Sequence, residues 1–398
     1  MSKVYSTALD ETLEIGRIID HLKGEKEGPT VVFFAGIHGN EPAGIFALKH
    51  VMRELKLQQR SILGEVYAIA GNLRALEKNV RFLDEDLNRI WSPEKVKHIQ
   101  QKKEGLKGDE NELFELHELL SEILKKSASP LYFIDLHTTS SETSPFVVLN
   151  DSLLNRKFAS NYPLPIVLGI EEYLEGALLS FINELGYVSL GYESGQHDEV
   201  SAIKNCIDFI HFTLGLTESV NLSKSEQTIL KSMVLKSGKV SNKFYEIYYQ
   251  YNIEKGSDFK MLPGFVNFQK IPNGRDVAMD NDCILKAKGN RQIFMPLYQN
   301  QGSEGFYYIR SIPTILLWAS KGLRKLKADH LLVKFPGIKW ESLKKDAMLV
   351  DQRVARFLAK SIFHLLGYRA RQLDKTHLVV KSREIASKNE EYLNTDWF

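Results

Sequence analysis

The sequence predicts an α/β fold: a mixed, mostly parallel sheet with helices on both faces, followed by a smaller all-β domain and a helical tail. Three observations lead to this expectation. Strongly apolar, β-branched segments alternate with amphipathic ones in the first half of the chain; short strands and tight turns follow; helical spacing then returns near the C-terminus. With 398 residues the chain exceeds one typical domain, so more than one is expected.

The first domain, residues 1–225, is built from alternating strands and helices. Strands are predicted at residues 30–37, 64–71, 130–139 and 187–193; polar residues are scarce in the first of them, which indicates burial on both faces, and the third is also predicted to be buried. Helices are predicted where apolar residues recur at helical spacing, at residues 41–56, 112–126, 177–186 and 199–216. This alternation is typical of a largely parallel sheet covered by helices on both faces.

Two further regions change character. Residues 226–320 combine aromatic, alternating segments with turns rich in Gly, Pro and Asp, which indicate a compact all-β domain. Residues 321–398 are predicted to form a helical C-terminal extension. In this extension one helix face would be apolar, formed by Val354, Phe357, Leu358, Ile362 and Leu365.

Bulk composition argues for a cytoplasmic protein without nucleic-acid or membrane partners. The net charge at pH 7 is +2, and the basic run in residues 321–327 is interpreted as a solvated helix face. The N-terminus has no secretory pattern, and no apolar run approaches the about 20 residues that span a bilayer. The two cysteines, Cys206 and Cys283, are far apart in the chain, which favours a reducing compartment.

A histidine and a glutamate follow the first buried strand, in the segment FFAGIHGNEPAGIF (residues 33–46). His38 stands where the strand ends, and Glu41 stands where the next helix begins, at the edge of the sheet where α/β proteins bind ligands. Imidazole nitrogen and carboxylate oxygen are zinc ligands. The alternative is that Glu41 only compensates the positive end of the helix dipole, and for the pair alone this alternative is favoured.

A third candidate ligand, His137, ends another buried strand in LYFIDLHTTSS (residues 131–141). Side chains alternate along a strand, so Asp135 shares a face with His137 and could orient a ligand from behind. His38, Glu41 and His137 together match catalytic zinc sites, which use three protein ligands and leave one position for water. A set of this kind would hold one Zn²⁺ per chain.

A candidate base follows the last predicted strand of the domain. Glu193 lies at its end and could take a proton from a zinc-bound water and pass it to a leaving amine. His197 and Glu199 are weaker candidates for this role. A capping or loop carboxylate is the competing interpretation of Glu193.

Substrate anchors are predicted between the first and third strand ends. The candidates are the polar residues of a partly apolar segment, Arg74, Arg81, Asn88 and Arg89. The planar arginine fork matches a carboxylate, so this group suits an anionic substrate. The alternative is a loop held by local salt bridges of Arg81 and Arg89 with Asp84 and Asp86, and it would be preferred without the zinc ligands.

These residues resemble the motifs of the succinylglutamate desuccinylase/aspartoacylase family, relatives of the zinc carboxypeptidases. GIHGNE (residues 36–41), NVRFLDEDLNR (79–89), FIDLHTTS (133–140) and GYESG (191–195) occur in the order of the family, with similar separations. Each motif is weak alone, but all of them in order are specific. MPLYQNQGSEGFYY (295–308) resembles the smaller C-terminal β domain of the family, whereas the last part of the chain is not covered.

The resemblance implies a zinc carboxypeptidase-like fold, zinc held by His38, Glu41 and His137, and Glu193 as general acid and base. It also implies that Arg81 polarises the scissile carbonyl, that Asn88 and Arg89 receive a substrate carboxylate, and that Tyr307 reaches the substrate from the β domain. Aspartoacylases carry an arginine shortly before the catalytic glutamate, and residues 177–193 contain none. N-acetylaspartate is therefore not the expected substrate.

The sequence thus predicts a zinc-dependent amidohydrolase, in which a zinc-bound water activated by Glu193 removes the acyl group of an N-acyl amino acid or a similar small, anionic amide. Two alternatives stay open: a zinc carboxypeptidase acting on peptides, and a non-catalytic ligand-binding protein on the same fold. A homo-oligomer formed through the C-terminal helices is compatible with each of them. The acyl group, the amine and the physiological metal are not determined by the sequence.

Overall fold

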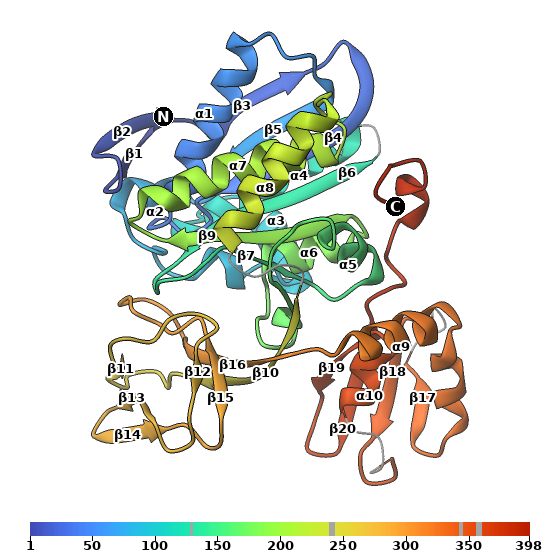
Figure 1. Ribbon diagram of the computed structural model, residues 1–398. Coiled ribbons are helices and arrows are strands. Elements are labelled where there is room, and N and C mark those ends of the chain that lie inside the picture. The colour runs from blue at the N-terminus through green and yellow to red at the C-terminus, as the bar shows by residue number, and fades with distance from the viewer. Residues whose placement is uncertain (128–129, 239–242, 342–344, 356–359) are drawn as a thin grey trace.

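The protein is described by a computed structural model that covers residues 1–127, 130–238, 243–341, 345–355 and 360–398. Its described part is organised around a mixed sheet of 11 strands in the order β12-β15-β16-β10-β8-β7-β9-β6-β4-β5-β3 (Figure 1). Helices cover both faces of its N-terminal half, and smaller antiparallel sheets lie in the C-terminal half. The α/β fold class predicted from the sequence is confirmed.

Four neighbouring strands of this sheet are parallel to one another. They are β4 (Lys26–Ala35), β5 (Leu63–Ala70), β6 (Leu131–Thr139) and β9 (Val188–Gln196). Antiparallel neighbours flank them, β3 (Ile18–Lys23) beside β5 and β7 (Phe146–Leu149) beside β9. The short β8 (Ile166–Leu168) pairs with β7, and a separate hairpin is formed by β1 (Ser2–Ser6) and β2 (Glu11–Ile15).

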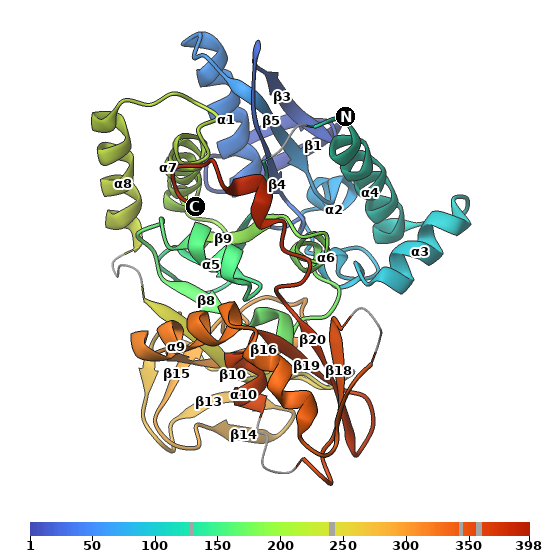
Figure 2. The ribbon, with the colours of Figure 1, turned by 90° about the vertical axis from the view of Figure 1, so that its right-hand side faces the viewer.

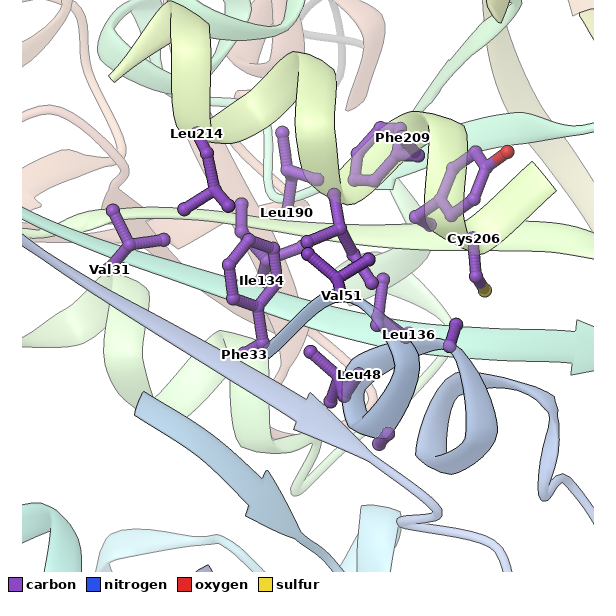
Figure 3. Packing of buried hydrophobic residues seen from close by; sticks show 14 of the residues in the cluster. Val31, Phe33, Leu48, Val51, Ile134, Leu136, Leu190, Cys206, Phe209 and Leu214 are labelled. Atoms are coloured by element: carbon purple, nitrogen blue, oxygen red, sulfur yellow. The ribbon is translucent and has the colours of Figure 1, made fainter. Parts of the chain in front are cut away.

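Helices form a layer on each face of this sheet (Figure 2), and alternate strand residues pack against opposite layers. One layer contains α1 (Ala43–Leu57), α5 (Leu153–Ala159) and α7 (Val200–Leu216); the other contains α3 (Pro93–Lys102), α4 (Gly108–Lys126) and α6 (Leu178–Glu184). Phe33 packs on the first layer and Phe34 on the second. Figure 3 shows strand residues Phe33 and Ile134 among side chains of α1 and α7. Burial on both faces explains why these strands have few polar residues.

The β-rich region continues the main sheet. β10 (Phe244–Asn252) pairs in parallel with β8, and the sheet extends antiparallel through β16 (Glu304–Ser311), β15 (Arg291–Phe294) and β12 (Lys270–Ile271). A second sheet contains β11 (Phe259–Met261), β13 (Asp276–Asp280) and β14 (Cys283–Lys286). One unpredicted helix, α8 (Lys224–Gly238), occupies the start of residues 226–320, so the all-β prediction is wrong for that stretch. The domain boundaries at residues 225 and 320 remain predictions.

The prediction that residues 321–398 are helical is wrong for much of this segment. The segment forms an antiparallel sheet of β17 (Ile338–Trp340), β18 (Ala347–Asp351), β19 (Tyr368–Gln372) and β20 (His377–Ser382). The helix α9 (Thr314–Lys325) ends within this segment, which also contains the 3-10 helices η3 (Ala328–Lys334) and η4 (Asn389–Tyr392) and the helix α10 (Lys360–Leu365). Phe357 and Leu358 lie outside the described residues.

The helical prediction failed because these strands are short, so the alternation of buried and exposed residues along each of them is weak. Met348 and Val350 of β18, and Leu378 and Val380 of β20, are buried at every second position. Such an alternation spans only a few residues, and the helical spacing that follows β18 outweighed it in the sequence. The basic run of residues 321–327 is solvated at Lys321, but Arg324 is buried and pairs with Asp151.

The C-terminal tail returns to the first region (Figure 1). The Tyr392 hydroxyl accepts a hydrogen bond from the Val188 N–H at 3.0 Å, and Trp397 Nε1 donates one to the Tyr132 hydroxyl at 3.0 Å. Both cysteines are free thiols, Cys206 buried and Cys283 exposed. Within the described ranges, every helix is too short or too polar to cross a lipid bilayer.

Candidate active site

The turn between β4 and α1 brings His38 and Glu41 together. After β4 ends at Ala35, the chain turns through Gly36, whose φ of 68° lies in the left-handed region. His38 and Glu41 are both buried, and His38 Nδ1 lies 2.8 Å from Glu41 Oε1. The two side chains therefore lie next to each other across this turn, as predicted from the sequence.

His137 joins them from β6. Parallel pairing aligns Ala35 of β4 with Leu136 of β6, so the ends of both strands lie at one edge of the sheet. His137 Nδ1 lies 3.0 Å from Glu41 Oε2, and the centroids of the His38 and His137 rings are 5.1 Å apart. One potential ligand atom from each of the three residues lies within 4.8 Å of the others. Among the described residues, no other cluster of His, Cys, Asp and Glu meets this criterion.

The outer nitrogens of both imidazoles are held by carboxyl groups. His38 Nε2 lies 3.1 Å from Asp86 Oδ1, and His137 Nε2 lies 2.7 Å from Asp135 Oδ2. The Nδ1 atoms of both rings therefore face Glu41. Carboxylates behind ligating histidines orient them in the same way in metalloproteins. The same-face relation of Asp135 and His137, expected from strand alternation, is confirmed by this contact.

The charges of the site fit a cation. Burial would raise the pKa of Glu41, but His38 and His137 outweigh it and hold that pKa well below its ordinary value. Burial would also raise the pKa of Asp86, which His38 and Arg81 instead hold well below its ordinary range. Burial would lower the pKa of His137, but Asp135 and Glu41 raise it well above its ordinary value. Excess carboxylate charge favours positive charge between the imidazoles, and these donors match those of zinc.

Glu193 lies beside His137 because β9 pairs with β6 in a register that aligns these two residues. Its side chain is buried, and within the described structure Oε2 has no hydrogen-bond partner. Burial, together with the charges of Glu41 and Asp135 and against the opposing effect of His137, raises the pKa of Glu193 to about 8. This carboxyl group can therefore hold and release a proton near neutral pH.

Arg81 is held over the cluster by two carboxylates. Its guanidinium lies 3.2 Å from Asp86 Oδ2 and 3.5 Å from Glu41 Oε1. Its backbone carbonyl accepts a hydrogen bond from the Gly39 N–H at 3.1 Å, which joins the two loops. The predicted salt bridge between Arg81 and Asp86 is thus part of the site and not an alternative to it.

Asn88 and Arg89 line the same pocket on η1 (Leu87–Arg89). Asn88 Oδ1 accepts a hydrogen bond from the Leu178 N–H at 3.0 Å. The Nδ2 donor of the same amide takes no part in this hydrogen bond. The Arg89 guanidinium donates through Nε and Nη2 to the two carboxylate oxygens of Glu304, each at 3.2 Å. Glu304 was not recognised in the sequence, because a glutamate at the start of a short strand has no local signal.

Tyr307 of β16 reaches the pocket from the β-rich region, as expected. Burial raises its pKa above the ordinary tyrosine value, and the nearby Glu304 adds to the effect, so the phenol keeps its proton. The loop before β16 also contributes Gln299 to the pocket lining and places Gln301 against the backbone of Arg81. Gln299 Oε1 lies 3.1 Å from His197 Nε2, and Gln301 Oε1 accepts a hydrogen bond from the Arg81 N–H at 2.9 Å.

The three remaining candidates from the sequence are Arg74, His197 and Glu199, and of these only His197 lines the pocket. Arg74 does not join the predicted anchor group: its guanidinium pairs with Glu112 and Glu115 of α4, because α2 (Leu73–Lys78) packs beside that helix. His197 lines the pocket, where burial lowers its pKa. Glu199 precedes α7 and accepts a hydrogen bond from the Ser201 hydroxyl at 2.9 Å.

Comparison with known proteins relates this arrangement to one family. Residues 27–204 match the family model described as "Succinylglutamate desuccinylase/Aspartoacylase catalytic domain". A probable aspartoacylase of Acaryochloris marina is 28% identical over 203 residues, which cover 49% of this chain and 66% of that protein. A succinylglutamate desuccinylase of Photorhabdus laumondii is 23% identical over 290 residues, which cover 68% of this chain and 82% of that protein.

Shorter matches occur with vertebrate proteins. An N-acyl-aromatic-L-amino acid amidohydrolase of Xenopus tropicalis is 34% identical over 112 residues, which cover 28% of this chain and 34% of that protein. Across the first three relatives, the match therefore spans between 34% and 66% of the relative's length.

Solved structures share the fold. The succinylglutamate desuccinylase/aspartoacylase of Rhodobacter sphaeroides aligns with a TM-score of 0.53 at 16% identity, over 73% of this chain and 88% of that one. The succinylglutamate desuccinylase of Chromobacterium violaceum aligns with a TM-score of 0.52 at 16% identity, over 74% of this chain and 88% of that one. Residues 27–204, which contain the cluster of His38, Glu41 and His137, thus match the catalytic domain of the succinylglutamate desuccinylase/aspartoacylase family.

Proposed function

We propose that this protein is a zinc-dependent amidohydrolase that removes the acyl group from a small N-acyl amino acid or a similar carboxylate-bearing amide. The observation that carries the proposal is the convergence of the His38, Glu41 and His137 cluster, Glu193 and Arg81 on one pocket. The match of residues 27–204 to a family of deacylases supports the same reaction.

His38 Nδ1, a Glu41 carboxylate oxygen and His137 Nδ1 would hold the zinc ion. When bound, zinc supplies Lewis acidity, which lowers the pKa of a water ligand and polarises the carbonyl of the amide. Asp86 and Asp135 keep the imidazoles in the ligating orientation through the outer ring nitrogens.

Glu193 moves the proton of the reaction. Its carboxylate accepts a proton from the attacking water while the water oxygen bonds to the carbonyl carbon. It then delivers this proton to the nitrogen of the leaving amine, so the C–N bond breaks with the amine uncharged. The unpartnered Oε2 and the raised pKa of Glu193 suit both steps.

Arg81 would stabilise the negative charge that develops on the carbonyl oxygen, because its guanidinium is fixed beside the cluster before substrate arrives. Asn88 Nδ2 and the part of Arg89 not used by Glu304 would receive the substrate carboxylate. Tyr307 would donate a hydrogen bond from its protonated phenol.

The pocket favours small amides over peptides. Residues of the β-rich region, from Met295 to Tyr307, form one wall of the pocket that holds the metal-ligand cluster. A wall on this side restricts an extended chain more than a small molecule. A carboxypeptidase activity is therefore the second candidate, and a non-catalytic binding protein is the third, disfavoured by a poised acid–base group that binding alone does not require.

Glu193→Gln tests the proposal. The variant keeps the metal ligands and the shape of the side chain but cannot accept a proton, so zinc content should stay near one per chain while kcat falls roughly 10²–10⁴-fold. Purified protein loaded with zinc is assayed for amine release from N-acyl amino acids and for release of C-terminal residues from peptides. Glu199→Gln, a change of the same type outside the pocket, is the control.

Absence of amine release from every N-acyl amino acid, with zinc bound, would contradict the proposal. Faster release of C-terminal residues from peptides would support the carboxypeptidase instead. Turnover of Glu193→Gln equal to that of the parent protein would remove Glu193 from the mechanism.

A further inference from the structure

We propose that the pocket selects N-acyl substrates that carry an apolar chain and no more than one carboxylate. The inference rests on the proposed amidohydrolase function and narrows its substrate class. It follows from the charges and the apolar surface that line the pocket.

Both arginines of the pocket are already paired. Arg81 lies between Asp86 and Glu41, and its guanidinium contacts both carboxylates within 3.5 Å. Arg89 donates to both oxygens of Glu304. Among the described lining residues, the only other cationic candidates are three histidines, of which His38 and His137 belong to the metal-ligand cluster.

Arg89 can therefore balance little further negative charge. Its Nη1 donates to the backbone carbonyl of Asn88 at 2.9 Å, while Nε and Nη2 are directed to Glu304. The Ser303 hydroxyl donates to Glu304 Oε1 at 2.9 Å and fixes this carboxylate in place. One substrate carboxylate can share the guanidinium with Glu304 and the Asn88 amide, but a second carboxylate finds no unpaired cation.

The rest of the lining is largely apolar. Its members come from β7, the 3-10 helix η2 (Ile170–Glu172), α6 with its preceding loop, and the turn after β15. They are Val148, Leu149, Ile170, Leu174, Ala177, Leu179, Met295 and Leu297. An apolar chain of the acyl group or of the amine would gain stability by leaving water for this surface.

The charged group among these apolar residues has the wrong sign for a dicarboxylate. Glu171 lines the same wall, where Oε1 lies 3.0 Å from Arg383 Nε and accepts a hydrogen bond from the Asp151 N–H at 3.1 Å. A second substrate carboxylate here would lose its hydration beside another carboxylate, which is costly without a paired cation. N-acetylaspartate and N-succinylglutamate are therefore poor substrates in this pocket.

A matched pair of substrates tests the selection. N-acetyl-L-norleucine and N-acetyl-L-glutamate have side chains of similar length, one apolar and one charged. With zinc-loaded protein, kcat/KM should be roughly 10–200-fold higher for the norleucine compound, the range that a pocket gains from apolar contacts. Equal or higher kcat/KM for the glutamate compound would overturn the inference.

Two variants change the preference in a defined direction. Glu304→Gln removes the carboxylate that occupies Arg89, and Leu179→Arg adds a cation to the apolar wall. Leu179 is only partly buried and lines the pocket, whereas its neighbour Leu178 lies in the core. Each variant should lower KM for the glutamate compound relative to the norleucine compound, while Leu326→Arg, on a residue that is 79% exposed, should not.

A binding measurement separates failure of this inference from failure of the proposed function. Zinc-loaded Glu193→Gln protein is titrated calorimetrically with each acetylated amino acid. If the parent protein hydrolyses neither compound, the amidohydrolase proposal fails, and the titration still decides the selectivity. Tighter binding of N-acetyl-L-norleucine supports the inference, and equal or tighter binding of N-acetyl-L-glutamate overturns it.

Discussion

At the scale of single residues, the candidate metal cluster of His38, Glu41 and His137 depends on carboxylates that do not belong to it. His38 and His137 each have one ring nitrogen facing Glu41 and the other beside an aspartate. A histidine fixed in this way loses little rotational freedom when a metal binds, and its outer nitrogen is the one that carries the proton. Asp135 and Asp86 are thus positioning residues for the proposed zinc site.

Asp135→Asn should weaken zinc binding by roughly 10–100-fold, because the amide keeps the shape of the side chain but loses the charge that orients His137. The measurement is competition for zinc against a chelator of known affinity. Asp84→Asn, an exposed position in the loop that also carries Asp86, is the matched control and should leave the affinity unchanged. Equal zinc affinity of both variants would show that Asp135 has no orienting role.

At the scale of elements, the loop between β4 and α1 is shaped by its contact with α2. A Cβ atom on Gly39 would lie 2.1 Å from the backbone carbon of Ala75, so only glycine allows this approach. The Gly39 N–H also donates to the Arg81 carbonyl. The position of His38 and Glu41 therefore depends on a helix that contributes no side chain to the metal-ligand cluster.

Gly39→Ala should push this loop away from α2, with a loss of about 1–3 kcal/mol in the free energy of unfolding and a lower zinc affinity. Chemical denaturation and zinc titration measure the two effects. Gly322→Ala is the control, since a Cβ atom at this position in α9 meets no other atom within 4 Å. This control should be neutral or should stabilise the helix by up to about 1 kcal/mol, and a loss equal to that of Gly39→Ala would refute the steric argument.

At the scale of the whole molecule, a buried ionic network attaches the C-terminal sheet to the first region. Arg324 of α9 and Arg383 after β20 both contact Asp151 Oδ2, at 2.8 Å and 3.2 Å. Arg383 also pairs with Glu171 and Glu172 of η2. Because Glu171 lines the pocket, the C-terminal sheet supports one wall of the proposed active site.

Glu172 makes this attachment sensitive to pH. Burial raises the pKa of Glu172 from 4.5 to about 7, although the charge of Arg383 opposes the effect. The folded protein then holds this proton more tightly than the unfolded chain, so the contribution of Glu172 to stability is largest below pH 4.5 and declines as pH rises from 4.5 through about 7. The loss is at most about 3 kcal/mol for this one group.

Glu172→Gln should remove this decline, because the amide stays uncharged at every pH. The difference in melting temperature between the variant and the parent protein should grow in favour of the variant between pH 5 and about pH 7.5, above the raised pKa. Glu390→Gln, at an exposed position, should change the melting temperature equally at both pH values. A constant difference for Glu172→Gln would contradict the raised pKa.

Much of the α/β fold of residues 1–225 could be predicted because its sequence patterns involve residues that are close together in the chain. Strands such as β4 and β6 are buried on both faces, so their apolar runs are continuous, and the polar residues at their ends are conspicuous. His38, Glu41 and His137 were found in this way. The C-terminal sheet was missed because each of its strands is too short to show its alternation clearly.

The sequence by itself determined the fold class of the first region and the residue types at the strand ends, since burial and side-chain alternation act over a few neighbouring residues. Only the tertiary structure decided what those residues face: Asp86 behind His38, Glu304 on Arg89 and the C-terminal sheet against the pocket wall. Such contacts join distant parts of the chain. They depend on strand register and loop packing, which no local pattern of residues encodes.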